Sequence, residues 1–216
     1  MNLSIQGLRP LSFLPDSRAS KVWGQNLVWD QGHSVQVRAP SGRGKSTFAM
    51  ALVGLRKDWN GSILWNGTAL NEVGFTEARS SWLAYVPQNL GVFESLTVEK
   101  NLQLRLSHQG QNWTAFENDD FWRRACDFSG LSSHWTKPAG QLSQGERQRV
   151  SLLRALMFPF SWLIMDEPFS HLDEERAKGF WSLCQERVQQ WGAGLVITSL
   201  NGESFIHAQE VEVIDL

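Results

Sequence analysis

The feature that most restricts the fold of this chain is a glycine-containing segment between a strand pattern and a helix pattern. It runs from Ala39 to Thr47 and reads Ala-Pro-Ser-Gly-Arg-Gly-Lys-Ser-Thr. Val35 and Val37 alternate with polar residues before it, and residues 46–55 after it are mostly apolar. Glycines let consecutive N–H groups turn toward phosphate oxygens, and the start of a helix adds a positive end. The sequence therefore predicts a phosphate-binding loop here.

Two residues of this loop have distinct predicted roles. We expect Lys45 to reach the β- and γ-phosphates of a nucleotide and Ser46 to place its hydroxyl on Mg²⁺. The usual motif opens with glycine where this chain has Ala39, so a positive φ at that residue would be costly. A glycine-rich turn that only caps a helix is the alternative for this motif alone. The residues expected to contact the nucleotide are Ala39, Pro40, Ser41, Gly42, Arg43, Gly44, Lys45, Ser46 and Thr47.

A second motif is an apolar run that ends in two carboxylates. Residues 162–167 read Trp-Leu-Ile-Met-Asp-Glu, which is typical of a buried parallel strand. Asp166 at the end of such a strand is expected to help hold Mg²⁺. Glu167 then lies beside the γ-phosphate, where it can polarise the attacking water as a general base. An acidic pair before a turn at Pro168 is the simpler alternative.

The order of predicted elements indicates an α/β fold with a mainly parallel sheet. Helical patterns alternate with strand patterns, and no repeat or long linker divides the chain, so we expect one domain over residues 1–216. The predicted strands are 4–8, 35–37, 62–65, 83–86, 162–165 and 195–198, and the predicted helices are 46–55, 97–128, 143–157 and 174–191.

Composition excludes several classes of function. The chain has 216 residues with 20 basic and 22 acidic side chains, so a broad basic face for nucleic acid is not expected. The two cysteines, Cys126 and Cys184, have no metal-ligand spacing and are predicted to be inert. No signal peptide and no apolar run of about 20 residues is present, so a membrane role requires a partner. Eleven tryptophans follow no period, and the sequence alone does not assign them to the core or to an interface.

Residues 142–149, Leu-Ser-Gln-Gly-Glu-Arg-Gln-Arg, closely resemble the signature of the ATP-binding cassette (ABC) ATPases, Leu-Ser-Gly-Gly-Gln. Gln144 and Glu146 depart from that form. Ser143 and Glu146 also have the spacing of a capping box, which occurs in many unrelated helices. The resemblance implies that Ser143 and Gly145 contact the γ-phosphate of an ATP held by the opposite subunit.

Two further segments resemble this family in the expected order. Residues 85–88 resemble the Q-loop, in which Gln88 approaches Mg²⁺ and the attacking water. Residues 170–173 resemble the D-loop, which brings Asp173 to the dimer interface. The resemblance implies a P-loop NTPase core with a mainly parallel sheet, a small antiparallel β subdomain and an inserted α-helical subdomain at about 89–142.

One position departs from the family pattern, and the residue that stacks on adenine is not assigned. Ser199 stands where members carry a switch histidine, so we expect hydrolysis to be slow but real. The family places an adenine-stacking aromatic residue after the first strand, and Phe13 is the first candidate and Trp23 the second.

The resemblance implies an ATP-binding and ATP-hydrolysing motor subunit of an ABC transporter, peripheral on the cytoplasmic face of the membrane. Two identical or different cassettes would enclose two ATP molecules with Mg²⁺ and drive a separate permease. Val92, Phe93 and Leu96 form an apolar cluster where the family has the groove for the permease, and internal packing is the alternative for each. Two alternative functions stay open. The chain could be a nucleotide-gated ABC subunit with weak or no hydrolysis, or the ATPase of a non-transport membrane complex such as one for cell division or lipoprotein release. The sequence does not indicate the substrate or the direction of transport.

Overall fold

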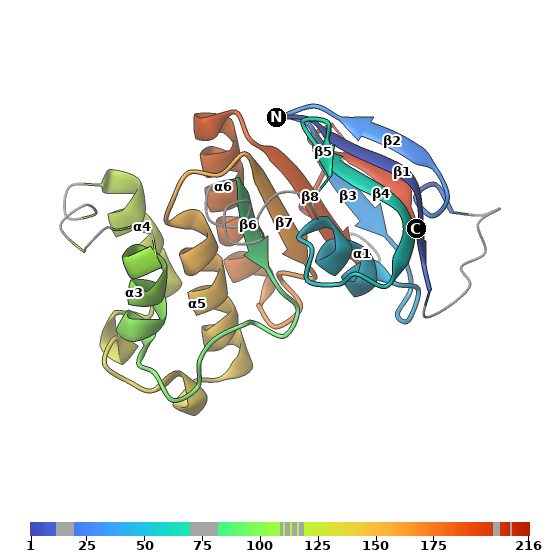
Figure 1. The fold of residues 1–216 in the computed structure, drawn as a ribbon. Helices are drawn as coiled ribbons and strands as arrows, with labels where there is room; N and C mark the ends of the chain where they lie inside the picture. The colour runs from blue at the N-terminus through green and yellow to red at the C-terminus, as the bar shows by residue number, and fades with distance from the viewer. Residues whose placement is uncertain are drawn as a thin grey trace.

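A fully parallel sheet forms the centre of the protein. The structure, a computed structural model, describes residues 1–11, 20–69, 82–108, 110, 113, 116, 119–200, 204–207 and 209–216 (Figure 1). Every position of two central strands is buried, as their apolar sequences predict. The strand order confirms the predicted parallel α/β core. In spatial order the strands are β6 (Leu83–Val86), β7 (Trp162–Asp166), β8 (Gly194–Ser199), β3 (Ser34–Arg38) and β9 (Glu212–Asp215).

A second, antiparallel sheet lies at one end of the molecule (Figure 1). It confirms the small antiparallel β subdomain that the resemblance implies. Asn66 and Gly67 have φ values of 51° and 79°, which is the left-handed conformation that a tight hairpin turn requires. In spatial order its strands are β2 (Asn26–Trp29), β1 (Leu3–Pro10), β4 (Trp59–Trp65) and β5 (Thr68–Ala69).

Helices cover the parallel sheet and form the other end of the molecule (Figure 1). α1 packs on β7 and β8, while α5 packs on β6 and also contacts α3, α4 and α6. The helices are α1 (Lys45–Leu52), α3 (Val98–His108), α4 (Asp120–Ser129), α5 (Gln144–Leu156) and α6 (Glu174–Trp191), with 3₁₀ turns at Ser132–His134 and Ala139–Gln141.

Several predicted boundaries were wrong. The stretch 97–128 is not one helix, because α4 starts anew at residue 120, where Asp119 accepts a hydrogen bond from Trp122 N–H. α1 ends earlier than predicted, since Gly54 has a φ of 66°. Strands β2, β5 and β9 were not predicted, because they are short and partly exposed and lack a buried apolar run.

The tryptophans of the described residues serve mainly as core. Trp23, Trp65 and Trp162 are almost completely buried around the antiparallel sheet and α1. Trp65 and Trp162 meet edge to face at 5.7 Å, which joins the two sheets. The helical end has its own aromatic cluster of Trp113, Phe116, Trp122, Trp135 and Phe158.

The two thiols confirm the inert character predicted for them. Both cysteines are free, Cys184 is fully buried and Cys126 is partly buried. Burial raises the pKa of each thiol to about 12. Neither is therefore a thiolate at neutral pH.

Gly61 in β4 gives a test of the packing between β4 and β1. Its φ is 92°, and a Cβ there would lie 2.5 Å from the backbone oxygen of Gln6. Gly67 has a similar φ of 79° but open space around it. We expect Gly67→Ala to lower the free energy of unfolding by about 1–2 kcal/mol through φ alone, and Gly61→Ala to lower it by clearly more. Urea unfolding curves measure both, and equal losses would contradict the close approach.

Candidate nucleotide-binding site

The predicted phosphate loop connects the end of β3 to the start of α1. Gly42 and Gly44 have φ values of 77° and 97°, so both use the left-handed region that favours glycine. Gly44 is the N-cap of α1, and no described side chain caps that helix start. No atom lies within 4 Å of the place of a Cβ on Gly42. The loop therefore offers uncapped N–H groups and room to an anion.

Ala39 at the start of the loop causes no strain. Among the described non-glycine residues, positive φ occurs at Asn66, Leu90 and Glu167, so Ala39 has an ordinary backbone. It is 4% exposed, and its N–H donates to the Ser199 carbonyl at 3.2 Å. Alanine in place of glycine at position 39 therefore causes no backbone strain, because the residue does not need a positive φ.

Lys45 is the buried cation of the site. Its side chain is 4% exposed, and Nζ donates to the carbonyls of Ala39 and Pro40 at 2.7 and 3.1 Å. Nζ also lies 3.1 Å from Oε1 of Glu167. The ammonium is thus fixed under the loop between carbonyl and carboxylate oxygens. In this place it can exchange these partners for phosphate oxygens.

Gln88 joins the loop to the carboxylate. Ser46 Oγ donates to Gln88 Oε1 at 3.0 Å, and Gln88 Nε2 donates to Glu167 Oε2 at 3.1 Å. The structure therefore brings four of the sequence-predicted residues, from three separate segments, into one network. Two hydrogen bonds and one ion pair thus link Lys45, Ser46, Gln88 and Glu167.

Glu167 has an unusual backbone. Its φ of 47° is left-handed, which is uncommon for a residue other than glycine, asparagine or aspartate. The end of β8 holds it in place, because its N–H donates to the Thr198 carbonyl at 3.1 Å. This bend turns the chain directly after β7, and the carboxylate, at 12% exposure, reaches Lys45 and Gln88.

Asp166 and Thr198 form the deeper part of the site. Thr198 Oγ1 donates to Asp166 Oδ1 at 2.6 Å, and Thr198 pairs directly with Asp166 across β7 and β8. Burial raises the pKa of Asp166, while hydrogen bonds from Thr198 and Ser46 counteract the rise. Sequence analysis missed Thr198. Its signal is that it ends an apolar strand of the same sheet, where parallel strands place their carboxyl ends together.

The oxygen atoms at this place suit Mg²⁺. The hydroxyl of Ser46 donates to Gln88 Oε1 at 3.0 Å and lies close enough to the Asp166 carboxylate to lower its pKa. Hydroxyl, amide and carboxylate oxygens are hard ligands of the type that Mg²⁺ takes in protein sites alongside phosphate and water. The three residues predicted as metal ligands therefore fit that role by chemistry and by proximity.

The raised pKa of Asp166 predicts how stability depends on pH. Because the native pKa lies above the unfolded value, the native state binds more protons in the window between them, and stability falls as pH rises through that window. Asp166→Asn keeps an acceptor for Thr198 but carries no charge. We expect this variant, without nucleotide, to melt at a higher temperature than wild type at pH 7, with the gain shrinking toward pH 4. Thermal unfolding by circular dichroism, with the surface variant Asp30→Asn as control, measures this. A variant that melts below wild type at pH 7 would contradict it.

Ser199 and Trp23, two further residues that the sequence suggested for the site, are both buried. Ser199 is 1% exposed, and its Oγ accepts a hydrogen bond from Gln36 Nε2 at 3.2 Å. The Ser199 side chain thus contacts strand β3. Phe13 lies outside the described residues. Trp23 is 1% exposed and packs edge to face on Phe48, so it belongs to the core and presents no free face to a base.

The predicted signature lies at the start of α5. Ser143 caps the helix, and its Oγ and N–H both donate to Glu146 Oε2 at 2.8 Å, which completes the capping box. A Cβ on Gly145 would lie 2.7 Å from the His171 carbonyl, so the signature touches the D-loop segment of the same chain. Asp173 there accepts a hydrogen bond from Arg176 N–H at 2.8 Å and caps α6. The starts of α1 and α5 lie in different parts of the molecule (Figure 1).

Taken together, the loop, the buried lysine and the two strand-end carboxylates have the arrangement expected of a P-loop nucleotide site on a parallel α/β core. The family model described as ABC transporter matches residues 24–170. The chain belongs to the ABC transporter family, a family of ATP-binding ATPases.

Similar proteins include one that is named for export and one that is named for import. The chain is 31% identical to the cytochrome c biogenesis ATP-binding export protein CcmA 2 of Cupriavidus metallidurans, covering 81% of this chain and 80% of that protein. It is 36% identical to the molybdenum import ATP-binding protein ModC of Saccharophagus degradans, over 63% of this chain and 37% of that protein.

A solved structure supports the fold. The dimeric post-hydrolysis state of the ATP-binding cassette MJ0796, bound to ADP and Pi, matches with a TM-score of 0.81 at 21% identity. The match covers 99% of this chain and 94% of that one. In the described part of this chain, no helix is both long and apolar enough to cross a membrane.

Proposed function

We propose that this chain hydrolyses ATP as the motor subunit of a transporter, dimerises with a second cassette around two ATP molecules, and drives a separate permease from the cytoplasmic face of the membrane. We further propose a single domain over residues 1–216 with a helical subdomain at about 89–142. The observation that carries the proposal is the network of Lys45, Ser46, Gln88 and Glu167, in which a fixed ammonium faces a positioned carboxylate.

The proposed chemistry follows from this network. Glu167 accepts a proton from the attacking water, and Gln88 holds that carboxylate in position. Lys45 offsets the negative charge of the β- and γ-phosphates once it leaves its loop carbonyls. Ser46, Gln88 and Asp166 would hold Mg²⁺, and the bound ion would neutralise charge on the phosphate oxygens. Turnover is slow in this proposal, because Ser199 stands where the family carries a switch histidine and its Oγ accepts a hydrogen bond from Gln36.

The second cassette supplies the remaining contacts in this proposal. Because α1 and α5 start in different parts of one chain, Ser143 and Gly145 would complete the phosphate site of the partner, with Asp173 at the interface. The start of α5 has a positive helix end for the γ-phosphate. Glu146 works against this, since its carboxylate already accepts from both Ser143 donors.

Removing the charge of Glu146 should therefore favour the dimer. Glu146→Gln keeps an acceptor for the capping box but no longer repels phosphate. In a Glu167→Gln background that prevents turnover, we expect half-maximal dimerisation at an ATP concentration about two- to fivefold lower, as for an exposed charge pair. Light scattering after size exclusion measures the dimer, with Glu212→Gln on the edge strand β9 as control. An unchanged or higher ATP requirement would contradict the repulsion.

Steady-state ATP hydrolysis with Mg²⁺ tests the function as a whole. Turnover by the wild-type chain would support the motor. Binding of ATP without turnover by the wild type would favour the second candidate, a nucleotide-gated subunit. A failure to bind ATP at all would refute both.

A further inference from the structure

A carboxylate lies beside the two signature donors that the proposed phosphate contact needs. Glu146 stands where the common family signature has glutamine, and its Oε2 accepts hydrogen bonds from the N–H and the Oγ of Ser143, both at 2.8 Å. These bonds, that of the N–H first, lower the pKa of Glu146, while burial opposes the shift. The carboxylate is therefore ionised at neutral pH, in a place where an ATP phosphate is expected.

The second oxygen of this carboxylate faces a histidine from a different segment. His134 Nδ1 lies 3.4 Å from Glu146 Oε1, and the two side chains are 29% and 19% exposed. Nδ1 is buried and has no hydrogen bond to any described residue. After the Ser143 bonds, the charge of His134 is the next cause that lowers the pKa of Glu146. The contact is thus strongest when the imidazole is protonated, because opposite charges favour each other.

The backbone fixes the place of the His134 ring. His134 ends a 3₁₀ turn, where its N–H donates to the Leu131 carbonyl and its own carbonyl accepts from Lys137 N–H, both at 2.8 Å. Leu131 is fully buried, and the Trp135 carbonyl accepts from Glu99 N–H of α3 at 3.0 Å. The histidine is thus held by contacts on both of its sides, and its distance from α5 depends on packed elements.

The other cation that acts on Glu146 has a fixed charge. Arg149 lowers the pKa of Glu146 less than His134 does, and its Nε donates to the Gly145 carbonyl at 3.3 Å. The charged groups that act on Arg149 in turn are Arg176, Glu146 and Asp173. A guanidinium stays protonated at every pH near neutral, so Arg149 cannot make the signature respond to pH.

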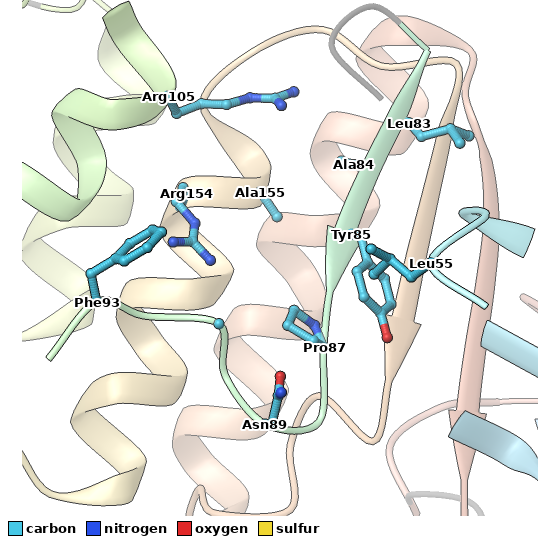
Figure 2. Close-up of a pocket in the computed structure, with 11 residues that line it drawn as sticks. Leu55, Leu83, Ala84, Tyr85, Pro87, Asn89, Phe93, Arg105, Arg154 and Ala155 are labelled. Carbon is cyan, nitrogen blue, oxygen red and sulfur yellow. The ribbon is translucent and has the colours of Figure 1, made fainter. Parts of the chain in front are cut away.

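The remaining arginines of α5 have other surroundings. Arg147 Nη1 pairs with Glu94 Oε1 at 2.8 Å. Arg154 lies in the last turn of the helix, where it lines a separate pocket beside β6 together with Arg105 (Figure 2). Glu146 is in the first turn of the same helix, so this pocket and the signature are at opposite ends of α5.

A second histidine near the signature faces other partners. Nδ1 of His171, in the D-loop segment, lies 3.2 Å from Gln148 Oε1 and 3.0 Å from Ser170 Oγ. His171 is not among the groups that shift the pKa of Glu146. Histidine is the side chain that ordinarily changes its charge between pH 5 and pH 8. Among the described charged groups that act on Glu146, His134 is therefore the one that can change near neutral pH.

We propose that His134 is a positioning residue of the signature, which holds the Glu146 carboxylate and, in its protonated form, offsets the negative charge so that the Ser143 donors admit the γ-phosphate held by the second cassette. This inference rests on the proposed function and adds a dependence on pH to it. At mildly acidic pH an imidazole carries a positive charge that offsets the carboxylate, and at higher pH that charge is lost. ATP-dependent dimerisation should therefore be stronger at mildly acidic pH.

The test compares His134→Asn with the parent chain in the Glu167→Gln background. Asparagine keeps an amide donor near the place of Nδ1 but never carries a charge. Light scattering after size exclusion gives the ATP concentration for half-maximal dimerisation at pH 6 and at pH 8. At pH 6 we expect the parent chain to need about two- to fivefold less ATP than His134→Asn, and at pH 8 we expect similar requirements. Glu146→Gln in both chains should abolish the difference at pH 6, because no carboxylate remains to be offset.

A second histidine–glutamate pair supplies the matched control. His33 Nε2 lies 2.7 Å from Glu212 Oε2 on the edge strand β9, and His33→Asn should leave the ATP requirement unchanged at both pH values. Equal requirements of parent and His134→Asn at pH 6 would overturn the inference. A difference of the same size at both pH values, or one that persists with Glu146→Gln, would show a merely structural role and would overturn it as well. A parent chain that binds ATP but forms no dimer at either pH would refute the proposed dimer itself and, with it, the role of His134.

Discussion

Glu167→Gln is expected to reduce ATP turnover by about 10²–10⁴-fold while leaving ATP binding intact, because an amide cannot accept the proton of the attacking water. The substitution keeps the shape of the side chain and an acceptor for Gln88, whose Nε2 donates to Glu167 at 3.1 Å. It removes the charge that faces Lys45 at 3.1 Å.

Steady-state phosphate release and equilibrium ATP titration measure the two halves of this prediction. Glu212→Gln, on the edge strand β9, is the matched control and should hydrolyse at the wild-type rate. If the Glu167→Gln variant turns over within about threefold of wild type, Glu167 is not the base.

Lys45→Met is expected to weaken ATP binding by about 10- to 150-fold, which is the range for a charge-assisted hydrogen bond of about 1.5–3 kcal/mol. Methionine fills the space of the lysine stem but cannot donate to phosphate. Lys45 is 4% exposed and its partner Glu167 12%, so the single variant also leaves a largely buried carboxylate without its cation.

A double variant separates the two effects of this substitution. Lys45→Met with Glu167→Gln should recover most of the thermal stability that Lys45→Met loses, because no unpaired charge remains. It should not recover ATP binding. Calorimetric titration and thermal unfolding measure both, and Lys100→Met on the exposed face of α3 is the control. Binding restored in the double variant would show that Lys45 acts only through Glu167.

The parts of the site that sequence predicts are those formed by contiguous residues. The segment from Ala39 to Thr47 contains its own loop glycines, its lysine and its helix start, so its geometry depends on local backbone preferences. Likewise, the apolar run of β7 predicts a buried strand, and its end gives the place of Asp166 and Glu167.

Contacts between segments were not predictable in the same way. The bond from Thr198 to Asp166 depends on the neighbouring register of β7 and β8, which no local pattern contains. The capping box at Ser143 was predicted from spacing, but the close approach of Gly145 to His171 depends on how α5 and the segment before α6 pack. The sequence alone could not assign the tryptophans to the core or to an interface, because aromatic residues are common in both. Their burial in the folded chain made the assignment.

The protonated thiols have a practical consequence for experiments on this chain. Burial raises the pKa of Cys126 and Cys184 to about 12, so both thiols are protonated at neutral pH. A maleimide or spin label reacts with the thiolate, so both native cysteines stay almost unmodified in the folded chain. A single cysteine introduced on an exposed surface should therefore be labelled selectively without removing the natural ones, and distances across the proposed dimer can be followed in a chain that keeps both natural cysteines.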